Sequence, residues 1–182
     1  ALGAAVDAGY GPALDAAEPG AALDALAAFR VLCAHRHGPF GVEPLNAAIA
    51  AALADRGPAG TASPAARAII VRRNDYAVGL YNGDVGLVAV PPGGGPPRAW
   101  FRQPDGALRD LAVGRLPAHE PAFALSVHQA QGSEFDAVAV VLPDAASPLL
   151  TRELLYTAVT RARSRLTLFA APEAVRWAVA QR

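Results

Sequence analysis

Lysine is missing from this sequence. Lysine and arginine together number 16 among the 182 residues, and the printed rows show that all 16 are arginine. A phosphate-binding G-x-x-x-x-G-K-[ST] loop is therefore excluded, because its lysine reaches the β- and γ-phosphates as a point charge. A Schiff-base lysine is excluded as well. Any nucleotide chemistry in this chain must use a site that another segment completes.

Methionine is also absent, and cysteine occurs once. Without Met at position 1, the chain is either processed or a piece of a longer protein, and we expect the second. The single Cys33 excludes an internal disulfide and a cysteine-rich metal cage, which fits a reducing compartment and a cytoplasmic location. No apolar run approaches the roughly 18 residues of a membrane helix, and the alanine-rich start lacks the features of a signal peptide. We expect a soluble protein without a membrane partner.

Charge of one sign is not in excess, since 16 basic residues balance 16 acidic ones. With 53% hydrophobic residues, the chain is long enough for one ordinary domain core, or for a domain with a small insertion. The charges are spread unevenly, because residues 67–118 carry seven arginines against four acids. Clustered arginines suit the phosphates of a nucleic acid. From charge alone, a solvated strand face remains the default interpretation.

The first two thirds of the chain change from an α/β pattern to a β pattern. Apolar runs predict buried strands, leucine and isoleucine at every fourth position predict a helix, and Gly-Pro pairs predict breaks. From residue 84, short strands joined by tight turns predict a small antiparallel module, too short for a large core and therefore an insertion on a larger domain. The expected elements are helices within 1–28 broken at Gly11-Pro12 and Pro19-Gly20, a strand at 30–34, a helix through Leu45, Ile49 and Leu53 closed by Gly57-Pro58, and strands at 68–71, 85–90, 99–102 and 108–113.

After Pro121 the α/β pattern returns. Continuous apolar strands that alternate with helices indicate a parallel sheet covered on both faces. Thr151 is the expected N-cap of a helix, and Pro172 begins a last helix that runs to Ala180. The expected strands are 123–127, 137–142 and 166–169, and the expected buried side of the first helix consists of Leu154, Leu155, Ala158, Val159 and Ala162.

Two segments in this last part carry the most chemical information. Residues 126–136 form a polar loop that we expect at the carboxyl edge of a parallel strand, where ligands gather in open α/β sheets. Mutual hydrogen bonding across a turn is the alternative role for its polar residues. Residues 156–163 end a helix with Arg161 and Arg163. From position alone a structural role is the default for both, because the helix dipole favours cations there.

The sequences of these two segments and their order along the chain point instead to a functional role. Ser126-Val-His-Gln-Ala-Gln-Gly-Ser-Glu-Phe135 and Thr160-Arg-Ala-Arg163 strongly resemble motifs V and VI of superfamily 1 helicases. Upstream, Arg73-Asn-Asp-Tyr76 and Gly79-Leu-Tyr-Asn-Gly-Asp-Val-Gly86 are similar to the C-terminal motor lobe of the RecD family. The likeness spans residues 29–171.

The resemblance implies an α/β fold. It is the RecA-like parallel-sheet lobe of a helicase C-terminal domain, of P-loop NTPase type without its own P-loop, and it carries a small SH3-like β insertion. The expected parts are an alanine-rich helical lead-in at 1–28, the lobe at 29–83, the insertion at 84–120, and the rest of the lobe at 121–182.

The resemblance also implies roles for individual residues. Arg161 would be the catalytic arginine finger that reaches the γ-phosphate across a cleft between two lobes. Gly132 and Glu134 would contact the nucleotide, Glu134 at its ribose. Arg36 would supply a second phosphate contact, although the end of its strand could equally leave it in solvent. The residues expected along single-stranded DNA are Arg73, Asn74, Tyr76, Asn82, Gly83, Asp84, Ser126 and His128. Lysine is common in the family where this chain has Gln129, which puts a phosphate contact there in doubt.

The activity implied by the family belongs to a longer protein. That protein would be an ATP-dependent helicase moving 5′ to 3′ on single-stranded DNA within the exodeoxyribonuclease V complex, with RecB- and RecC-like subunits, in double-strand break repair and recombination. ATP would bind with Mg²⁺ held by the N-terminal RecA-like lobe, so this chain alone is expected to be inactive. The alternatives are a stand-alone RecD-like helicase, a relaxase-linked helicase lobe, and a non-catalytic DNA-binding module.

A metal site is not expected. Cys33, His35 and His37 alternate and share a strand face. A structural zinc site usually needs four ligands, and the sequence offers no fourth. Trp100 is expected to pack within the β module, with stacking on DNA as the lesser alternative.

Overall fold

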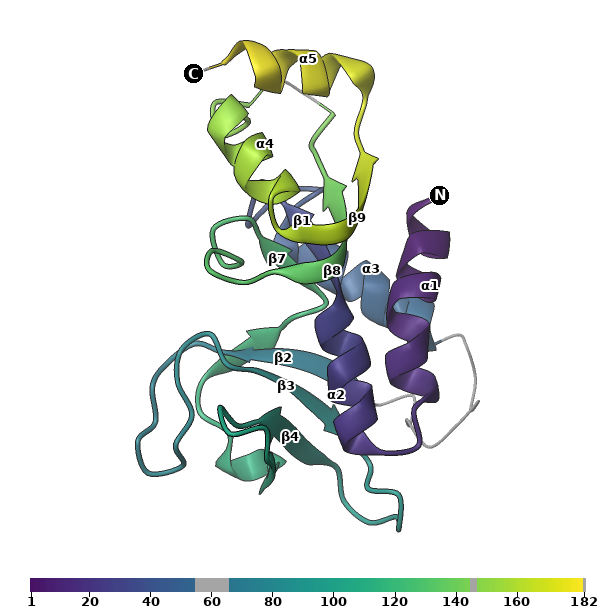
Figure 1. Cartoon of the computed structure of the whole chain (residues 1–182), viewed down its shortest axis with the longest axis vertical. Coiled ribbons are helices and arrows are strands. Elements are labelled where there is room, and N and C mark those ends of the chain that lie inside the picture. The colour runs from purple at the N-terminus through teal and green to yellow at the C-terminus, as the bar shows by residue number, and fades with distance from the viewer. Residues whose placement is uncertain (55–65, 145–146, 182) are drawn as a thin grey trace. The chain divides into compact units, whose positions relative to one another are not determined.

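The computed structural model describes residues 1–54, 66–144 and 147–181 (Figure 1). They form two compact units, each containing one sheet. The parallel-sheet unit consists of residues 1–9, 28–49 and 124–182, and the antiparallel-sheet unit consists of residues 10–27 and 50–123. The predicted helix end at Gly57-Pro58 lies outside the described residues.

Four parallel strands form the first sheet, in the order β7-β1-β8-β9. β1 (Phe29–Cys33) lies between β7 (Ala124–Ser126) and β8 (Phe135–Val141), and all five of its residues are buried. β9 (Ala162–Phe169) pairs with the other side of β8. The predicted parallel α/β sheet is therefore confirmed, with central strands that are apolar because both of their faces are covered.

The helices α4 (Arg152–Val159) and α5 (Pro172–Ala180) belong to this unit, and so does most of α3 (Val42–Ala54). The predicted N-cap of α4 is confirmed, because the Thr151 hydroxyl accepts a hydrogen bond from the Leu154 N–H at 3.2 Å. The predicted start of α5 at Pro172 is confirmed as well. A buried amide fixes α3 to the sheet. Asn46 donates to the carbonyl of Ala124 at 2.8 Å and accepts from its N–H at 3.0 Å.

The end of this unit differs from the prediction. Only Ala158 of the expected buried side of α4 is buried, Val159 is 37% exposed, and Ala162 opens β9 rather than continuing the helix. β9 has no fully buried residue, and Leu166 and Leu168 are 38% and 37% exposed. The expectation that both faces are covered is therefore wrong for this strand. Among the residues that the structure describes, β9 is an edge strand and pairs with β8 alone.

Five antiparallel strands form the second sheet, in the order β5-β4-β3-β2-β6. The predicted strands are confirmed as β3 (Val85–Ala89), β4 (Arg98–Arg102) and β5 (Leu108–Ala112), the last followed by the short helix η1 (Val113–Arg115). β2 (Arg67–Val71) and β6 (His119–Pro121) complete the sheet. Trp100 is 6% exposed and packs within it.

The limits of this module differ from the expected 84–120. β2 was expected in the α/β lobe, but it pairs with β3 and β6, so the antiparallel sheet starts at Arg67. An apolar run such as Ala68–Val71 suits a covered antiparallel strand as well as a parallel one, and the run alone therefore cannot identify its partners. The SH3-like character of the module stays a prediction.

The alanine-rich start forms α1 (Leu2–Asp15) and α2 (Pro19–Ala28), as helices were predicted there. Gly11-Pro12 does not break α1, contrary to the expectation, and Pro12 lies inside the helix. Tertiary contacts outweigh the local penalty: Tyr10 is fully buried, its hydroxyl donates to the Phe123 carbonyl, and the two rings meet edge to face at 5.1 Å. None of the helices in the described ranges is long and apolar enough to cross a membrane.

Candidate functional site

The loop that follows β7 is shaped by Gln129. Its Oε1 accepts from the N–H of Ser126 at 2.9 Å and from the Ser126 hydroxyl at 3.1 Å, and its own N–H donates back to Ser126 Oγ at 3.2 Å. These reciprocal bonds close a tight turn directly after the strand. For this pair the interpretation of mutual hydrogen bonding across a turn is confirmed, and Gln129 has a structural role that its departure from the family pattern did not indicate.

The end of the same loop carries Gly132 and Glu134. Gly132 has a φ of +83°, and no heavy atom lies within 4 Å of where a Cβ would be. A side chain would be strained there, and glycine leaves the backbone open to a ligand. The Glu134 carboxylate is exposed, and Arg163 Nε donates to its Oε2 at 3.1 Å. Glu134 is thus held by one cation and still has an oxygen accessible to solvent.

Arg161 follows the end of α4, and its guanidinium is bonded within its own unit. Nε donates to the Thr157 carbonyl at 3.2 Å, Nη1 to the Ser133 carbonyl at 3.0 Å, and Nη2 to the Thr160 hydroxyl at 3.4 Å. The backbone carbonyl of Arg161 accepts from the N–H of Phe135 at 2.8 Å. Side chain and backbone together join the end of α4 to the end of the loop, next to Glu134.

The strand register separates the two ends of this loop. Ser126 pairs with Cys33, which pairs with Val141, at the carboxyl ends of three parallel strands. Phe135 pairs with Ala162 at the amino ends of β8 and β9. At about 3.3 Å per residue the two levels are roughly 20 Å apart along β8. The expectation that the loop 126–136 lies at the carboxyl edge is therefore correct for Ser126 and wrong for Glu134, because the loop crosses the height of the sheet.

Arg36 and His128 are nearer the carboxyl level. Arg36 comes three residues after the end of β1, and its Nε lies 3.9 Å from Glu43 Oε1 in the first turn of α3. His128 is exposed in the turn that Gln129 closes. The structure therefore gathers Gly132, Glu134 and Arg161 at one end of the loop, with Ser126 and His128 at the other.

The remaining predicted residues lie in the antiparallel-sheet unit, in the loop between β2 and β3. Asn74 is occupied there, because its Oδ1 accepts from the N–H of Asn82 at 2.8 Å and its Nδ2 donates to the Tyr76 hydroxyl at 3.3 Å. Asp84 Oδ2 accepts from the N–H of Tyr81 at 2.8 Å, and Gly83 has a φ of +100°. Arg73 and Tyr76 are exposed. Asn74, Asn82, Gly83 and Asp84 thus build the loop, while Arg73 and Tyr76 face solvent.

Two neighbours in these loops were missed at the sequence level. Arg163 was predicted to lie at the end of a helix with a structural role. It lies in β9 instead, and it forms an ion pair with Glu134. Tyr81 is 50% exposed beside Tyr76, with the ring centroids 6.0 Å apart and the planes at 74°. The sequence carried a signal for Tyr81, because Tyr81 directly follows the apolar Leu80. Leu80 is buried, and successive side chains of an extended chain point to opposite sides.

Cys33 is fully buried, and burial raises the pKa of its thiol from 9.0 to about 12. The hydrogen bond to the His35 carbonyl lowers this pKa by less than burial raises it. A neutral thiol is a poor metal ligand and a poor nucleophile. Within the ranges that the structure describes, no three His, Cys, Asp or Glu residues are grouped to hold a metal ion.

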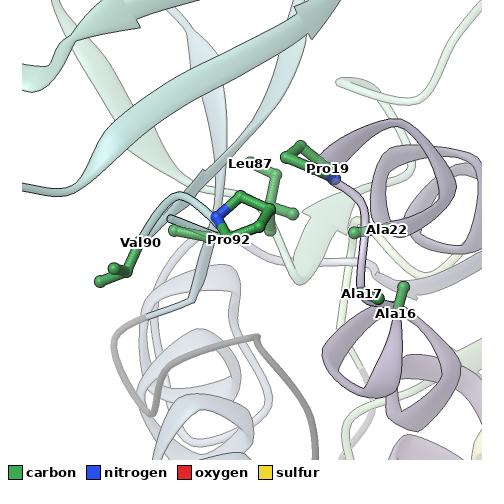
Figure 2. A pocket seen from close by; sticks show the side chains of 8 residues that line it. Ala16, Ala17, Pro19, Ala22, Leu87, Val90 and Pro92 are labelled. Carbon is green, nitrogen blue, oxygen red and sulfur yellow. The ribbon is translucent and has the colours of Figure 1, made fainter. Parts of the chain in front are cut away.

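A small apolar pocket lies in the antiparallel-sheet unit (Figure 2). Only alanine, proline, leucine and valine side chains line it, and Figure 2 shows Pro19 and Ala22 facing Leu87 and Pro92 across it. Its lining offers no group for acid–base, nucleophilic or ionic chemistry. The candidate chemistry therefore remains with the two loops.

Comparisons with known proteins agree on a helicase lobe. Residues 121–169 match the family model of the UvrD-like helicase C-terminal domain. The RecBCD enzyme subunit RecD of Mycobacterium tuberculosis (strain CDC 1551 / Oshkosh) is 44% identical over 163 residues, which cover 88% of this chain and 28% of that protein. RecD of Haemophilus influenzae is 40% identical over 78% of this chain and 21% of its own length. The ATP-dependent RecD2 DNA helicase of Deinococcus radiodurans is 35% identical over 84% of this chain and 21% of its own length.

The chain thus spans about a quarter of the length of the curated relatives it matches. Among solved structures, Pif1 helicase from Bacteroides in complex with ADP-AlF3 and ssDNA has a TM-score of 0.50 at 17% identity, over 77% of this chain and 40% of that one. A structure of two coordinating Pif1 helicases at forked dsDNA has a TM-score of 0.53 at 17% identity, over 87% of this chain and 44% of that one. This likeness shows the fold, which is of the α/β class.

Proposed function

We propose that this chain, which resembles RecD helicase subunits over most of its length, is the C-terminal motor lobe of an ATP-dependent DNA helicase. One observation carries the proposal. Arg161, just after the end of α4, donates to the backbone carbonyl of Ser133, the residue before Glu134, so that an arginine and a glutamate are both positioned where the loop after β7 reaches β8. Such a pair can bind the two ends of a nucleoside triphosphate.

The donor set here fits half of an ATP site. Arg161 offers a planar fork for phosphate oxygens, Glu134 offers a free acceptor for a ribose hydroxyl, and Gly132 leaves open space beside its backbone. Because the chain has no lysine, the P-loop and the ligands of Mg²⁺ would belong to an N-terminal RecA-like lobe. ATP hydrolysis supplies the free energy for movement. Arg36, after β1, is the candidate for a second phosphate contact.

Arg161 would have to exchange its partners before it could act as the arginine finger. Its three nitrogens now donate to two carbonyls and one hydroxyl, which are neutral acceptors. An anionic phosphate attracts the guanidinium more strongly than a neutral carbonyl or hydroxyl oxygen does, and it can accept two parallel N–H bonds at once. A phosphate brought close by the other lobe can therefore compete for the same donors. We infer that closure of the two lobes moves Arg161 from this resting position.

DNA contacts are proposed for the other end of the loop and for the antiparallel-sheet unit. Ser126 and His128 lie at the carboxyl level of the sheet, on the same loop as Glu134, and would connect the DNA backbone to the nucleotide site. Arg73 and Tyr76 are exposed and would contact phosphate and base. The DNA contacts of Arg73 and Tyr76 would depend on the shape of their loop. That loop is held by Asn74, Asn82, Gly83 and Asp84.

The whole protein would move 5′ to 3′ on single-stranded DNA with RecB- and RecC-like partners, as an exodeoxyribonuclease V that acts in double-strand break repair and recombination. One observation favours a second candidate, a helicase without these partners. The RecD2 helicase of Deinococcus radiodurans matches nearly as much of this chain as the RecD subunits do. Co-purification of the tagged full-length protein from its own cells separates the two candidates, because only the first yields two large partner subunits in equal amounts.

DNA-stimulated ATP hydrolysis tests the proposed function. The full-length protein is expected to release phosphate faster with single-stranded DNA and to unwind duplexes that carry a 5′ tail. The 182-residue chain alone is expected to release none, since it lacks the P-loop lysine. Sustained hydrolysis by the pure chain would contradict the proposal, and so would a full-length protein that ignores DNA.

A further inference from the structure

Two tyrosines stand out on the surface of the antiparallel-sheet unit. Tyr76 is 78% exposed and Tyr81 is 50% exposed, and their rings meet edge to face with centroids 6.0 Å apart. Single exposed aromatic residues are common on protein surfaces. Two that contact each other on one loop, with their planes at 74°, form a corner of two aromatic rings that solvent can reach.

The loop beneath them is rigid. Asp75 and Leu80 exchange both backbone hydrogen bonds, at 2.7 and 3.1 Å, and Asp75 Oδ1 accepts from the N–H groups of Ala77 and Val78. Val78 and Leu80 are 5% and 0% exposed and belong to the core over the sheet, with Phe101 among their neighbours. Burial of these two side chains fixes the backbone, so that the flanking tyrosines point outward at little cost in conformational entropy.

Polar contacts also hold the first ring in place. The Asn74 amide donates to the Tyr76 hydroxyl at 3.3 Å, while the N–H of Tyr81 donates to Asp84. Both contacts engage the edge or the backbone and leave the ring faces free. A preorganised aromatic surface binds a flat ligand more tightly than a mobile one, because less side-chain freedom is lost.

A cation lies against the same loop. Arg109, on β5, places Nη1 so close to Gly79 that a Cβ there would lie 2.8 Å from it. In the part of the chain that the structure describes, Arg109 has neither an ion-pair partner nor a side-chain hydrogen bond. The neighbouring Asp110 is paired with Arg98 instead. An arginine without a carboxylate, lying against a loop that carries two exposed aromatic rings, has the composition of a single-stranded nucleic-acid site.

We propose that Tyr76, Tyr81 and Arg109 form one nucleotide-binding site, in which an unpaired base stacks on the face of one tyrosine beside the other ring, and a phosphate of the same strand binds Arg109. The inference rests on the proposed function and adds two residues to its DNA path. The seven arginines and four acids of residues 67–118 favour a polyanion over a protein partner. Because the site uses base faces, it accepts any sequence and rejects a duplex, whose base faces are stacked.

The test compares a labelled oligo-dT with an abasic oligonucleotide of the same length, by fluorescence anisotropy on the nucleotide-free full-length protein. Tyr81→Ala is expected to weaken oligo-dT binding by about 5- to 160-fold, the range for loss of one stacked base. Abasic binding should stay unchanged. Arg109→Ala should weaken both ligands and lower the salt dependence of binding by about one phosphate contact. Tyr81→Phe should bind like wild type, because it keeps the ring face.

Tyr156→Ala is the matched control, since Tyr156 is 70% exposed on α4, outside the loop, and should not change binding. If Tyr81→Ala fails to fold, Tyr81→Leu takes its place, because leucine keeps bulk and lacks the π face. If Tyr81→Ala weakens oligo-dT and abasic binding equally, or weakens neither, the proposed site is overturned. DNA-stimulated ATP hydrolysis by the same protein would still support the proposed function. Protection of the tyrosines by a protein partner and not by oligo-dT would overturn it as well.

Discussion

The guanidinium of Arg161 donates a hydrogen bond to the carbonyl oxygen of Ser133 at 3.0 Å. This bond joins the end of α4 to the loop that runs from β7 to β8, and it places Arg161 one residue from Glu134. The acceptor is a backbone atom, so the loop can hold the arginine whatever side chain occupies position 133. In the proposed motor, this contact is the resting position of the arginine finger.

The pair of Arg163 and Glu134 gives a prediction about nucleotide affinity. Arg163→Ala in the full-length protein should raise the KM for ATP several-fold and change kcat little, because the arginine orients a ground-state contact to the ribose. Glu134→Gln should do the same, and the double variant should be no worse than either single one. Steady-state ATPase assays check this. Arg165→Ala, also exposed on β9, is the control, and independent effects of the two variants would contradict the pairing.

Asn46 should be essential for stability. Asn46→Ala removes both bonds to the Ala124 backbone and leaves the N–H and carbonyl of Ala124 without their partner, so the free energy of unfolding should fall by about 2–4 kcal/mol. Urea unfolding followed by circular dichroism measures this. Glu43→Ala, exposed on the same helix, should cost far less. Equal stability of the two variants would show that the amide does not hold α3 to the sheet.

Cys33 should make stability depend on alkaline pH. Burial raises the pKa of its thiol from 9.0 to about 12, so between these values the unfolded chain loses the thiol proton and the folded chain keeps it. The contribution is fully present below pH 9 and is lost toward pH 12. Its slope is at most about 1.4 kcal/mol per pH unit. Cys33→Ala should therefore flatten the fall in unfolding free energy above pH 9. Identical slopes would contradict the buried neutral thiol.

The local elements of this fold are largely predictable from the sequence. Apolar runs mark the positions of the parallel strands, and the Thr151 cap and Pro172 mark the starts of the last two helices, because these signals act within a few residues. Partners are harder to predict. The run at β2 is equally suited to either sheet, and only its pairing with β3 and β6 assigns it. The continuity of α1 through Pro12 likewise depends on the distant contact between Tyr10 and Phe123.

The candidate site is predictable in its residue types more than in its arrangement. The resemblance drew attention to Glu134 and Arg161, but their level in the sheet follows from the crossing of the loop after β7, which no local pattern encodes. Asn74 has the composition of a DNA contact, yet its amide is used to hold Asn82 and Tyr76. The sequence does not show hydrogen bonds such as the one from Asn82 to Asn74, and the role of Asn74 therefore could not be predicted.

Substitution of Arg161 tests the central claim most directly. In the full-length protein, Arg161→Ala should leave ATP affinity close to that of wild type, because the finger acts mainly in the transition state. DNA-stimulated kcat should fall by about 10³- to 10⁵-fold. Both values come from one set of ATPase and nucleotide-binding measurements. An unchanged kcat would contradict the assignment of this chain as the lobe that supplies the arginine finger.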